Sequence, residues 1–179
     1  ICLIDALKIA KLRIENYSMN SSRIDSIRHS LAHLLAAAVT ELYPDALPTI
    51  GPAIENGFYY DFDNLKISDA DLPKIEAKMR ELLPNWKEFT KEEKSSGEAA
   101  HHPVVAGNRY KKELVDEVAS RGEVISFYTC GGFTDLCRGG HAEHPAKEIK
   151  TNSFKLTHLA GAYWRGDSKN PQLTRIYGV

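Results

Sequence analysis

The sequence predicts an α+β protein in which a mainly antiparallel sheet packs around one long central helix. Three observations point to this class. Apolar residues recur at helical spacing up to Tyr43, the strand-like segments further along the chain come in hairpin-like pairs, and few helical segments separate those pairs. Because parallel strands need a crossover helix between them, this order favours antiparallel pairing, in two closely packed subdomains.

Length and composition narrow the class of protein. A chain of 179 residues can form a sizeable core, and 42% hydrophobic and 26% charged residues are typical of a soluble globular protein. A net charge of −1 gives no broad positive field for a long nucleic-acid duplex. Three widely spaced cysteines without a CxxC motif suit a reducing compartment, and we expect a cytoplasmic location. No apolar run approaches the ~20 residues of a membrane span, so we expect no membrane partner.

The chain begins with a stretch that has no clear pattern. We interpret residues 1–20 as an N-terminal extension, a linker or a leader sequence. Ser21 or Ser22 offers an N-cap for the helix that follows. Pro44 disfavours helical geometry at the residue before it, so we expect that helix to end near Tyr43.

The helix that ends near Tyr43 carries His29 and His33 on one face, because residues four apart share a side of a helix. An apolar stripe lies nearly opposite, made of Ile24, Ile27, Leu31, Leu34, Leu35, Ala38 and Leu42. No charged residue occurs from His29 through Thr40, and a helix without a charged face is usually covered all round. We therefore expect the two imidazoles to face something other than bulk water.

The segment from Pro48 to Asp63 has the pattern of a β-hairpin, since Asn56-Gly57 is a tight-turn dipeptide. Beyond the turn, aromatic residues alternate with more polar ones. We expect Phe58, Tyr60 and Phe62 to face the core or a cleft, and Tyr59, Asp61 and Asp63 to face solvent.

The next segment reads as a helix followed by a short strand. Apolar residues at helical spacing predict a helix over Ser68–Leu83, with Ser68 and Asp71 as a capping box. The pattern of Trp86–Thr90 is that of a short strand.

The middle of the chain is polar. We expect Lys91–Gly107 to be largely loop, with a capping signal for a short helix at Ser95. Tyr110–Ala119 then reads as a helix, which Gly122 closes.

The last third of the chain is dominated by strand patterns. We expect strands over Val124–Cys130, Phe154–His158, Ala160–Arg165 and Leu173–Tyr177. His158 continues the apolar face of its strand, so we interpret it as a core histidine.

A second pair of reactive residues, Cys137 and His141, flanks two glycines. A glycine-rich turn lets backbone N–H groups approach a ligand closely, as an oxyanion or phosphate site requires. With His29 and His33 this pair makes a His₃Cys set. Such a set could hold zinc, and it could equally form a metal-free hydrolytic site with an imidazole as general base. A histidine pair alone is more often structural, so the combination of the two pairs carries this interpretation.

Four blocks of the chain resemble, in the same order, the amino-terminal editing region of bacterial-type threonyl-tRNA synthetases. They are Arg28–His33, Ile50–Asp61, Asp135–His141, and Ala160–Asp167 with Arg175–Gly178. The likeness runs from Ser22 to the end of the chain and departs at Gly140, where proline is common. The wider family includes alanyl-tRNA editing domains, which share the two four-spaced pairs.

The resemblance implies post-transfer editing, that is, hydrolysis of the aminoacyl ester of mischarged Ser-tRNA(Thr). Serine is threonine without a methyl group, and a pocket gains only about 1–3 kcal/mol from one such group, so a second site must remove serine. The editing domain would span residues 21–179, with the Cys/His site in a subdomain of about 120–179. The implied partners are the 3′ aminoacylated end of tRNA(Thr) and, in a longer chain, the synthetase core. No ATP-binding motif of class II synthetases occurs in this sequence, so we expect deacylation and not charging of tRNA.

The resemblance also implies a set of site residues. They are the catalytic residues His29, His33, Cys137, His141, Lys111 and Asp135, with Tyr60 as a substrate-binding residue. A water held by an imidazole or through Lys111 would attack the ester. We expect no metal to be required, although the three histidines and the cysteine remain a possible zinc site.

Two rival interpretations stay open. One is a freestanding zinc-dependent alanyl-tRNA editing hydrolase. The other is a non-catalytic module that binds the acceptor end of tRNA.

Overall fold

The computed structural model describes the backbone of residues 3–179 and the side chains of residues 22–179. Its helices are α1 (Leu3–Leu42), α2 (Leu72–Leu82), α3 (Ser96–Ala100), α4 (Arg109–Ser120) and α5 (Pro145–Glu148), with short 3-10 turns at Asp69–Asp71, Leu83–Asn85 and Trp164–Gly166. Its strands are β1 (Leu47–Pro48), β2 (Ala53–Ile54), β3 (Gly57–Asp63), β4 (Thr90–Lys94), β5 (Ile125–Cys130), β6 (Phe133–Leu136), β7 (Leu156–Tyr163) and β8 (Gln172–Gly178).

The strands form two antiparallel sheets. The larger has the order β1-β3-β8-β7, with β2 also paired to β3, and the smaller has the order β4-β5-β6. The α+β prediction with mainly antiparallel pairing is therefore confirmed. Residues 120–179, where we expected the Cys/His subdomain, are divided between the sheets, because β5 and β6 belong to the smaller one and β7 and β8 to the larger.

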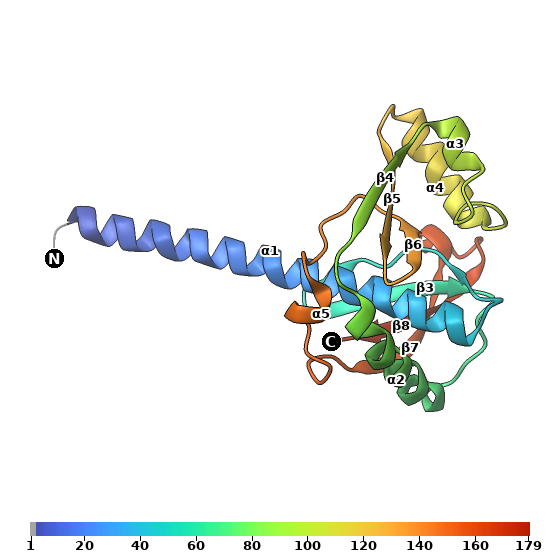
Figure 1. Ribbon diagram of the computed structural model, residues 1–179, viewed down its shortest axis with the longest axis horizontal. Helices are drawn as coiled ribbons and strands as arrows, with labels where there is room; N and C mark the ends of the chain where they lie inside the picture. Colours follow the sequence, from blue (N-terminus) through green and yellow to red (C-terminus); the bar gives the residue numbers. More distant parts are fainter. Residues whose placement is uncertain (1–2) are drawn as a thin grey trace.

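Helix α1 organises the fold. Figure 1 shows its N-terminal part projecting away from the rest of the protein and its C-terminal part lying along the larger sheet, where it contacts β3. The predicted start at Ser21 or Ser22 is wrong, because the helix runs without interruption from Leu3. No proline or glycine interrupts these 40 residues, and the hydroxyl of Ser26 donates to the carbonyl of Ser22 within the helix, 3.0 Å away. The predicted end near Tyr43 is confirmed.

The main core lies between α1, α2 and the larger sheet. Leu34 and Leu35 of α1 and Ile75 of α2 are fully buried there against the aromatic residues of β3. The inward orientation predicted for Phe58, Tyr60 and Phe62 is confirmed, since each is at most 1% exposed. A second apolar cluster, which includes Val115 of α4 and Phe127 of β5, lies beneath the smaller sheet.

Local turn and capping signals were accurate to within a residue. The carboxylate of Asp71 accepts the N–H and hydroxyl of Ser68, and α3 begins after Ser95 as expected. The hairpin turn falls on residues 55–56, one position early, because Gly57 already pairs with the opposite strand. A side chain at Gly57 would lie 2.1 Å from the carbonyl oxygen of Gly178, so this strand position needs glycine.

The strand predicted over Trp86–Thr90 is wrong. Trp86 is instead buried in the main core, and the strand of this region is β4, inside the segment that we expected to be loop. β4 is an edge strand whose side chains are almost all exposed, so it lacks the apolar alternation by which a strand is recognised.

Two further expectations fail on the larger sheet. The segments 154–158 and 160–165 do not form separate strands, because Leu156–Tyr163 is one strand with an irregularity between Leu156 and His158. A β-bulge re-aims the side chains beside it. His158 is therefore exposed and stacks on Tyr177, contrary to its interpretation as a core histidine.

Asp61, which we expected in solvent, is buried. Its carboxylate accepts two hydrogen bonds, of 2.6 and 2.8 Å, from the guanidinium of Arg175 on the neighbouring strand. The same guanidinium lies 3.8 Å from the ring centre of Tyr59. The ion pair explains how a charged residue can occupy a covered position in the sheet.

Replacing Arg175 by methionine should destabilise the protein by about 3 kcal/mol, because it leaves the Asp61 carboxylate buried without its partner. Urea unfolding followed by circular dichroism would measure the loss. The control is Lys112→Met, which breaks an exposed ion pair with Asp116 and should change stability little. Equal midpoints for the two variants would show that the buried pair does not stabilise the sheet.

Candidate active site

Two distant segments bring three imidazoles and a thiol together. His29 and His33 project from α1, and Cys137 and His141 lie on the loop after β6. The Nε2 atoms of His29 and His33 are 3.2 Å apart, and the sulfur of Cys137 lies 3.4 Å from the Nε2 atoms of both His29 and His141. The sequence pattern that placed the two pairs in one site is thus matched by the geometry.

The smaller sheet holds Cys137 at the end of β6. Its N–H donates to the carbonyl of Ser126 on β5 at 3.1 Å, and the hydroxyl of Ser126 donates to the Cys137 carbonyl at 2.6 Å. Gly139 and Gly140 then turn the chain with φ of 94° and 87°, a conformation that favours glycine. A side chain at Gly139 would also lie 2.5 Å from the Tyr128 hydroxyl.

The loop is tied back to α1 by a further hydrogen bond. The N–H of Ala142 donates to the hydroxyl oxygen of Ser30 at 3.0 Å. Ser30 is fully buried and lies on α1 between the two histidines. This contact fixes the distance between the His141 end of the loop and the helix.

Asp135 joins the site to three other elements. Its carboxylate accepts from Lys111 Nζ at 2.5 Å and from the Tyr60 hydroxyl at 2.5 Å, and lies 3.3 Å from Nδ1 of His33. Lys111 also donates to the Tyr60 oxygen at 3.2 Å. All four side chains are at most 4% exposed, so the network is shielded from bulk water.

Lys111 points inward because of how α4 begins. The side-chain oxygen of Asn108 accepts the N–H groups of Tyr110 and Lys111, which starts the helix at Arg109. The side-chain amide of Asn108 donates at 2.8 Å to the carbonyl of Pro48 on the larger sheet. The cap therefore fixes the first turn of α4 against the sheet and directs Lys111 to Asp135.

The network shifts the acidity of its members. Burial alone would raise the pKa of Asp135, but the neighbouring Lys111 and His33 hold it well below its usual range. Burial alone would lower the pKa of His33, but hydrogen bonds to Asp135 and Cys137 raise it from 6.5 to about 9. His33 therefore carries both of its protons at neutral pH.

The pKa values of the Cys137 thiol and of His141 are both lowered, for different reasons. Burial would raise the pKa of Cys137, but hydrogen bonds from His141, His29 and His33 lower it to about 3. Burial lowers the pKa of His141, although Cys137 opposes this shift, so His141 is neutral at neutral pH. Its ring stacks on Phe89 with centroids 3.8 Å apart. Lys111, Asp135, His33 and Cys137 thus form a row of alternating charges.

A cavity of about 470 Å³ reaches this row. His29, His33 and Cys137 line it together with Lys111 and Asp135. A second cavity of about 500 Å³ is lined by His141 and Phe89 on the other side of the cluster. The cluster is therefore accessible from two directions, and the first cavity has the size of a small-ligand site.

Comparison with known proteins places this geometry in a family. The sequence model described as "Threonyl and Alanyl tRNA synthetase second additional domain" matches residues 125–177, which include Cys137 and His141. The part of the chain from residue 125 to residue 177 is therefore similar to this second additional domain. The resemblance that the sequence blocks indicated is confirmed.

Longer relatives have the same region. Threonine–tRNA ligases of Burkholderia lata and Burkholderia orbicola are each 53% identical to this chain over 157 residues, and that of Paraburkholderia xenovorans is 50% identical over the same length. The match covers 87% of this chain and 24% of each relative. The chain therefore spans about a quarter of the length of these curated relatives.

All seven residues implied by the resemblance meet at one place in the structure. His29, His33, Cys137 and His141 form the cluster, and Asp135 connects it to Lys111 and Tyr60. Their catalytic and binding roles stay a prediction. Of the two adjacent lysines, Lys111 is buried in the site, whereas Lys112 is exposed and pairs with Asp116.

Sequence reasoning missed three supporting residues. Ser30 anchors the loop, Asn108 caps α4, and Phe89 stacks on His141. Asn108 stands two residues before the predicted helix and directly before the observed one, and it is an N-cap signal that could have been read. Phe89 lies among charged residues, and no local pattern distinguishes it.

The cluster is also a possible metal site. One donor atom from each of its four residues lies within 4.8 Å of the others. Two ligand atoms on one tetrahedral zinc ion are about 3.3–3.6 Å apart, and three of the separations here are 3.2, 3.4 and 3.4 Å. The mixture of imidazole nitrogen and thiolate suits zinc. The donor types and these three separations therefore suit a zinc ion, and the wider separations, of up to 4.8 Å, would have to shorten when an ion binds.

Among the residues that the structure describes, no helix is both long and apolar enough to cross a bilayer.

The lowered pKa predicts that Cys137 in the metal-free protein is a thiolate throughout the range from about pH 5 to 8. Thiolate ultraviolet absorbance, measured in a Cys2→Ser background with chelator present, would follow its titration. Cys137→Ser should abolish the signal. Cys130, whose pKa burial raises to about 11, is the matched control, and Cys130→Ser should leave the signal unchanged. A titration of Cys137 near pH 8 to 9 would contradict the charge assignment.

Proposed function

We propose that this chain hydrolyses the aminoacyl ester of mischarged Ser-tRNA(Thr), as part of or derived from a threonyl-tRNA synthetase. One observation carries the proposal: a shielded row of alternating charges, with a second imidazole beside it, forms the wall of a cavity. It lies in a chain that is about half identical to threonine–tRNA ligases. Ester hydrolysis needs an acceptor for the proton of water and fixed positive charge for the oxyanion, and these groups can supply both.

The charge states divide the tasks. His33 is already protonated at neutral pH, so its positive charge can stabilise an oxyanion, but it cannot take a proton from water. The proton acceptor is therefore His29, which lines the cavity, or His141, which burial keeps neutral. Asp135 holds His33 and Lys111 in place, and fixed cations in a shielded site stabilise developing negative charge more strongly than water does.

The natural partner in this proposal is the 3′ aminoacylated end of tRNA(Thr), with the remainder of a synthetase in a longer chain, in the cytoplasm. Selectivity follows from size. A site that admits serine and excludes the methyl group of threonine removes the error that the synthetic site cannot avoid.

A zinc-dependent alanyl-tRNA editing hydrolase is a second candidate, because the four donor atoms are of the kinds that zinc prefers and three of their separations fit zinc. His29, His33, Cys137 and His141 would hold the ion. A bound zinc ion would lower the pKa of a coordinated water to near neutrality. We infer that the ion is not required, since the charge network already contains a proton acceptor and two cations.

The double variant His33→Ala, Cys137→Ala should lower the rate of Ser-tRNA(Thr) deacylation at least about a hundredfold, because it removes a fixed cation and its counter-ion from the site. Single-turnover release of labelled serine measures the rate, and circular dichroism checks the fold. His158→Ala, which removes an exposed histidine on the larger sheet, is the control and should deacylate normally. Undiminished activity in the double variant would disprove the site assignment.

Chelator treatment should leave deacylation of Ser-tRNA(Thr) within twofold of the untreated rate, and Ser-tRNA(Ala) should be the poorer substrate. Metal content measured by plasma emission on the same samples completes the test. Stoichiometric zinc that leaves together with activity would favour the zinc-dependent candidate instead.

A further inference from the structure

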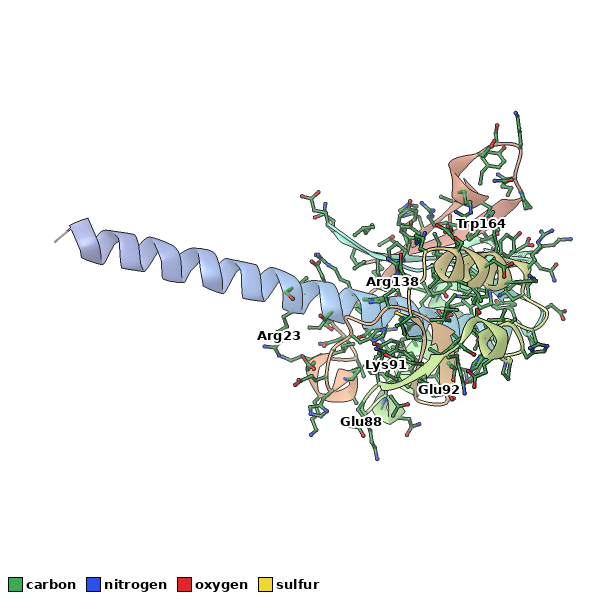
Figure 2. The ribbon with its side chains drawn as sticks, turned by 90° about the horizontal axis from the view of Figure 1, so that it is seen from above. Arg23, Glu88, Lys91, Glu92, Arg138 and Trp164 are labelled. Carbon is green, nitrogen blue, oxygen red and sulfur yellow. The ribbon has the colours of Figure 1, made fainter. Side chains whose placement is uncertain are left out.

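Two arginines from separate elements converge on one carboxylate beside the cavity. Arg121 directly follows α4, and Arg138, labelled in Figure 2, directly follows Cys137. Arg121 Nε lies 2.5 Å from one carboxylate oxygen of Glu123, and Arg138 Nη2 lies 2.6 Å from the other. Both arginines line the cavity that reaches His29 and Cys137. The carboxylate of Glu123 thus occupies an anion position between two guanidinium groups.

This arrangement contributes little to holding the fold together. The side chain of Arg138 is 70% exposed, and those of Arg121 and Glu123 are each 41% exposed. Ion pairs at such exposure stabilise a protein only slightly, because water screens them and ordering the side chains opposes the gain. An anion that binds the two arginines more tightly can therefore displace Glu123 with little loss of protein stability.

We propose that Arg121 and Arg138 bind a backbone phosphate of the RNA substrate, and that Glu123 occupies this position when no RNA is bound. The proposal rests on the proposed function, in which the substrate is an aminoacylated tRNA end. A phosphodiester, like a carboxylate, carries one negative charge over two oxygens, and guanidinium groups bind both in a planar, two-point geometry. Because Arg138 is adjacent to Cys137, a phosphate held there also positions the strand relative to the cluster.

The surface next to the arginines suits a nucleotide. Val124, which follows Glu123, is 62% exposed, and Ile50 across the cavity is 36% exposed, and both line the cavity. Ligand cavities are typically lined by apolar side chains together with a few charged or polar groups. A nucleotide offers an apolar base face to such side chains and a phosphate to the arginines.

The test uses two substitutions with opposite expected effects. Arg138→Gln should weaken binding of RNA about fivefold and reduce the salt dependence of binding by about one charge. Glu123→Gln should tighten binding about threefold, because it removes the anion that competes with the phosphate. The probe is an RNA hairpin that carries no amino acid, with the acceptor-stem sequence of tRNA(Thr) and a single-stranded CCA end. Its binding to the full 179-residue chain is measured by fluorescence anisotropy.

Lys112→Gln and Asp116→Asn provide the matched controls, since they remove one charge each from an exposed ion pair on α4 and should not change affinity. If Arg138→Gln and Glu123→Gln shift affinity in the same direction, or if neither shifts it, the phosphate site is disproved. Changes in the controls equal to those in the test pair would disprove it as well.

Deacylation separates this inference from the proposed function. In a chain that hydrolyses Ser-tRNA(Thr), Arg138→Gln should raise KM about fivefold and leave kcat within twofold. Hydrolysis with an unchanged KM would disprove the phosphate site and retain the editing function. Absence of hydrolysis by the unaltered chain, combined with the opposite shifts in RNA affinity, would disprove editing and retain the phosphate site.

Discussion

The structure of the site depends on one buried carboxylate, that of Asp135. A carboxylate removed from water requires close cations or hydrogen-bond donors, and Asp135 has three from three other elements, besides the N–H of the adjacent Leu136. Lys111 comes from α4, Tyr60 from the larger sheet and His33 from α1. The need to compensate one charge therefore fixes the relative positions of both sheets and two helices. The cavity lies where these elements meet.

The same charge determines what the cluster can do. Asp135 stabilises the imidazolium form of His33, and hydrogen bonds from His141 and His29, together with this imidazolium, stabilise the thiolate of Cys137. The two pKa shifts are coupled, because the negative charge of the thiolate and the positive charge of the imidazolium stabilise each other. Cys137 is consequently an anion and His33 a cation at neutral pH. In the proposed function, His29 and His141 are then the imidazoles that remain for proton transfer. This assignment of roles follows from the whole network and not from any one residue.

Much of this could be predicted from the sequence where a local rule applied. The four-residue spacing placed His29 and His33 on one helix face, and the glycine pair indicated a tight turn beside Cys137. The family blocks contain Tyr60 and Asp135, and the resemblance also implied Lys111, which lies outside those blocks. That all of them meet in one site depends on long-range pairing, which spacing within one segment cannot show.

The failures have the same physical origin. Asp61 is buried although we expected it in solvent, because Arg175 on the next strand pairs with its carboxylate. His158 is exposed although we expected it in the core, because an irregularity in its strand turns the side chain outward. β4 escaped detection because an exposed edge strand needs no apolar alternation. Ser21 and Ser22 resembled a helix cap, but capping residues are also tolerated inside a helix that no glycine or proline interrupts.

The energetics of the buried network favour a chemical role for it over a structural one. Replacing a buried ion pair by apolar side chains of similar size is often neutral or stabilising, so stability alone does not require Lys111 and Asp135. The pair Arg175 and Asp61 differs, because it joins adjacent strands and does not line the cavity that reaches the cluster. Lys111 and Asp135 both line the cavity and hold His33 protonated beside it. Buried charges that stability alone does not require are intelligible when they also act on a substrate that develops charge beside them.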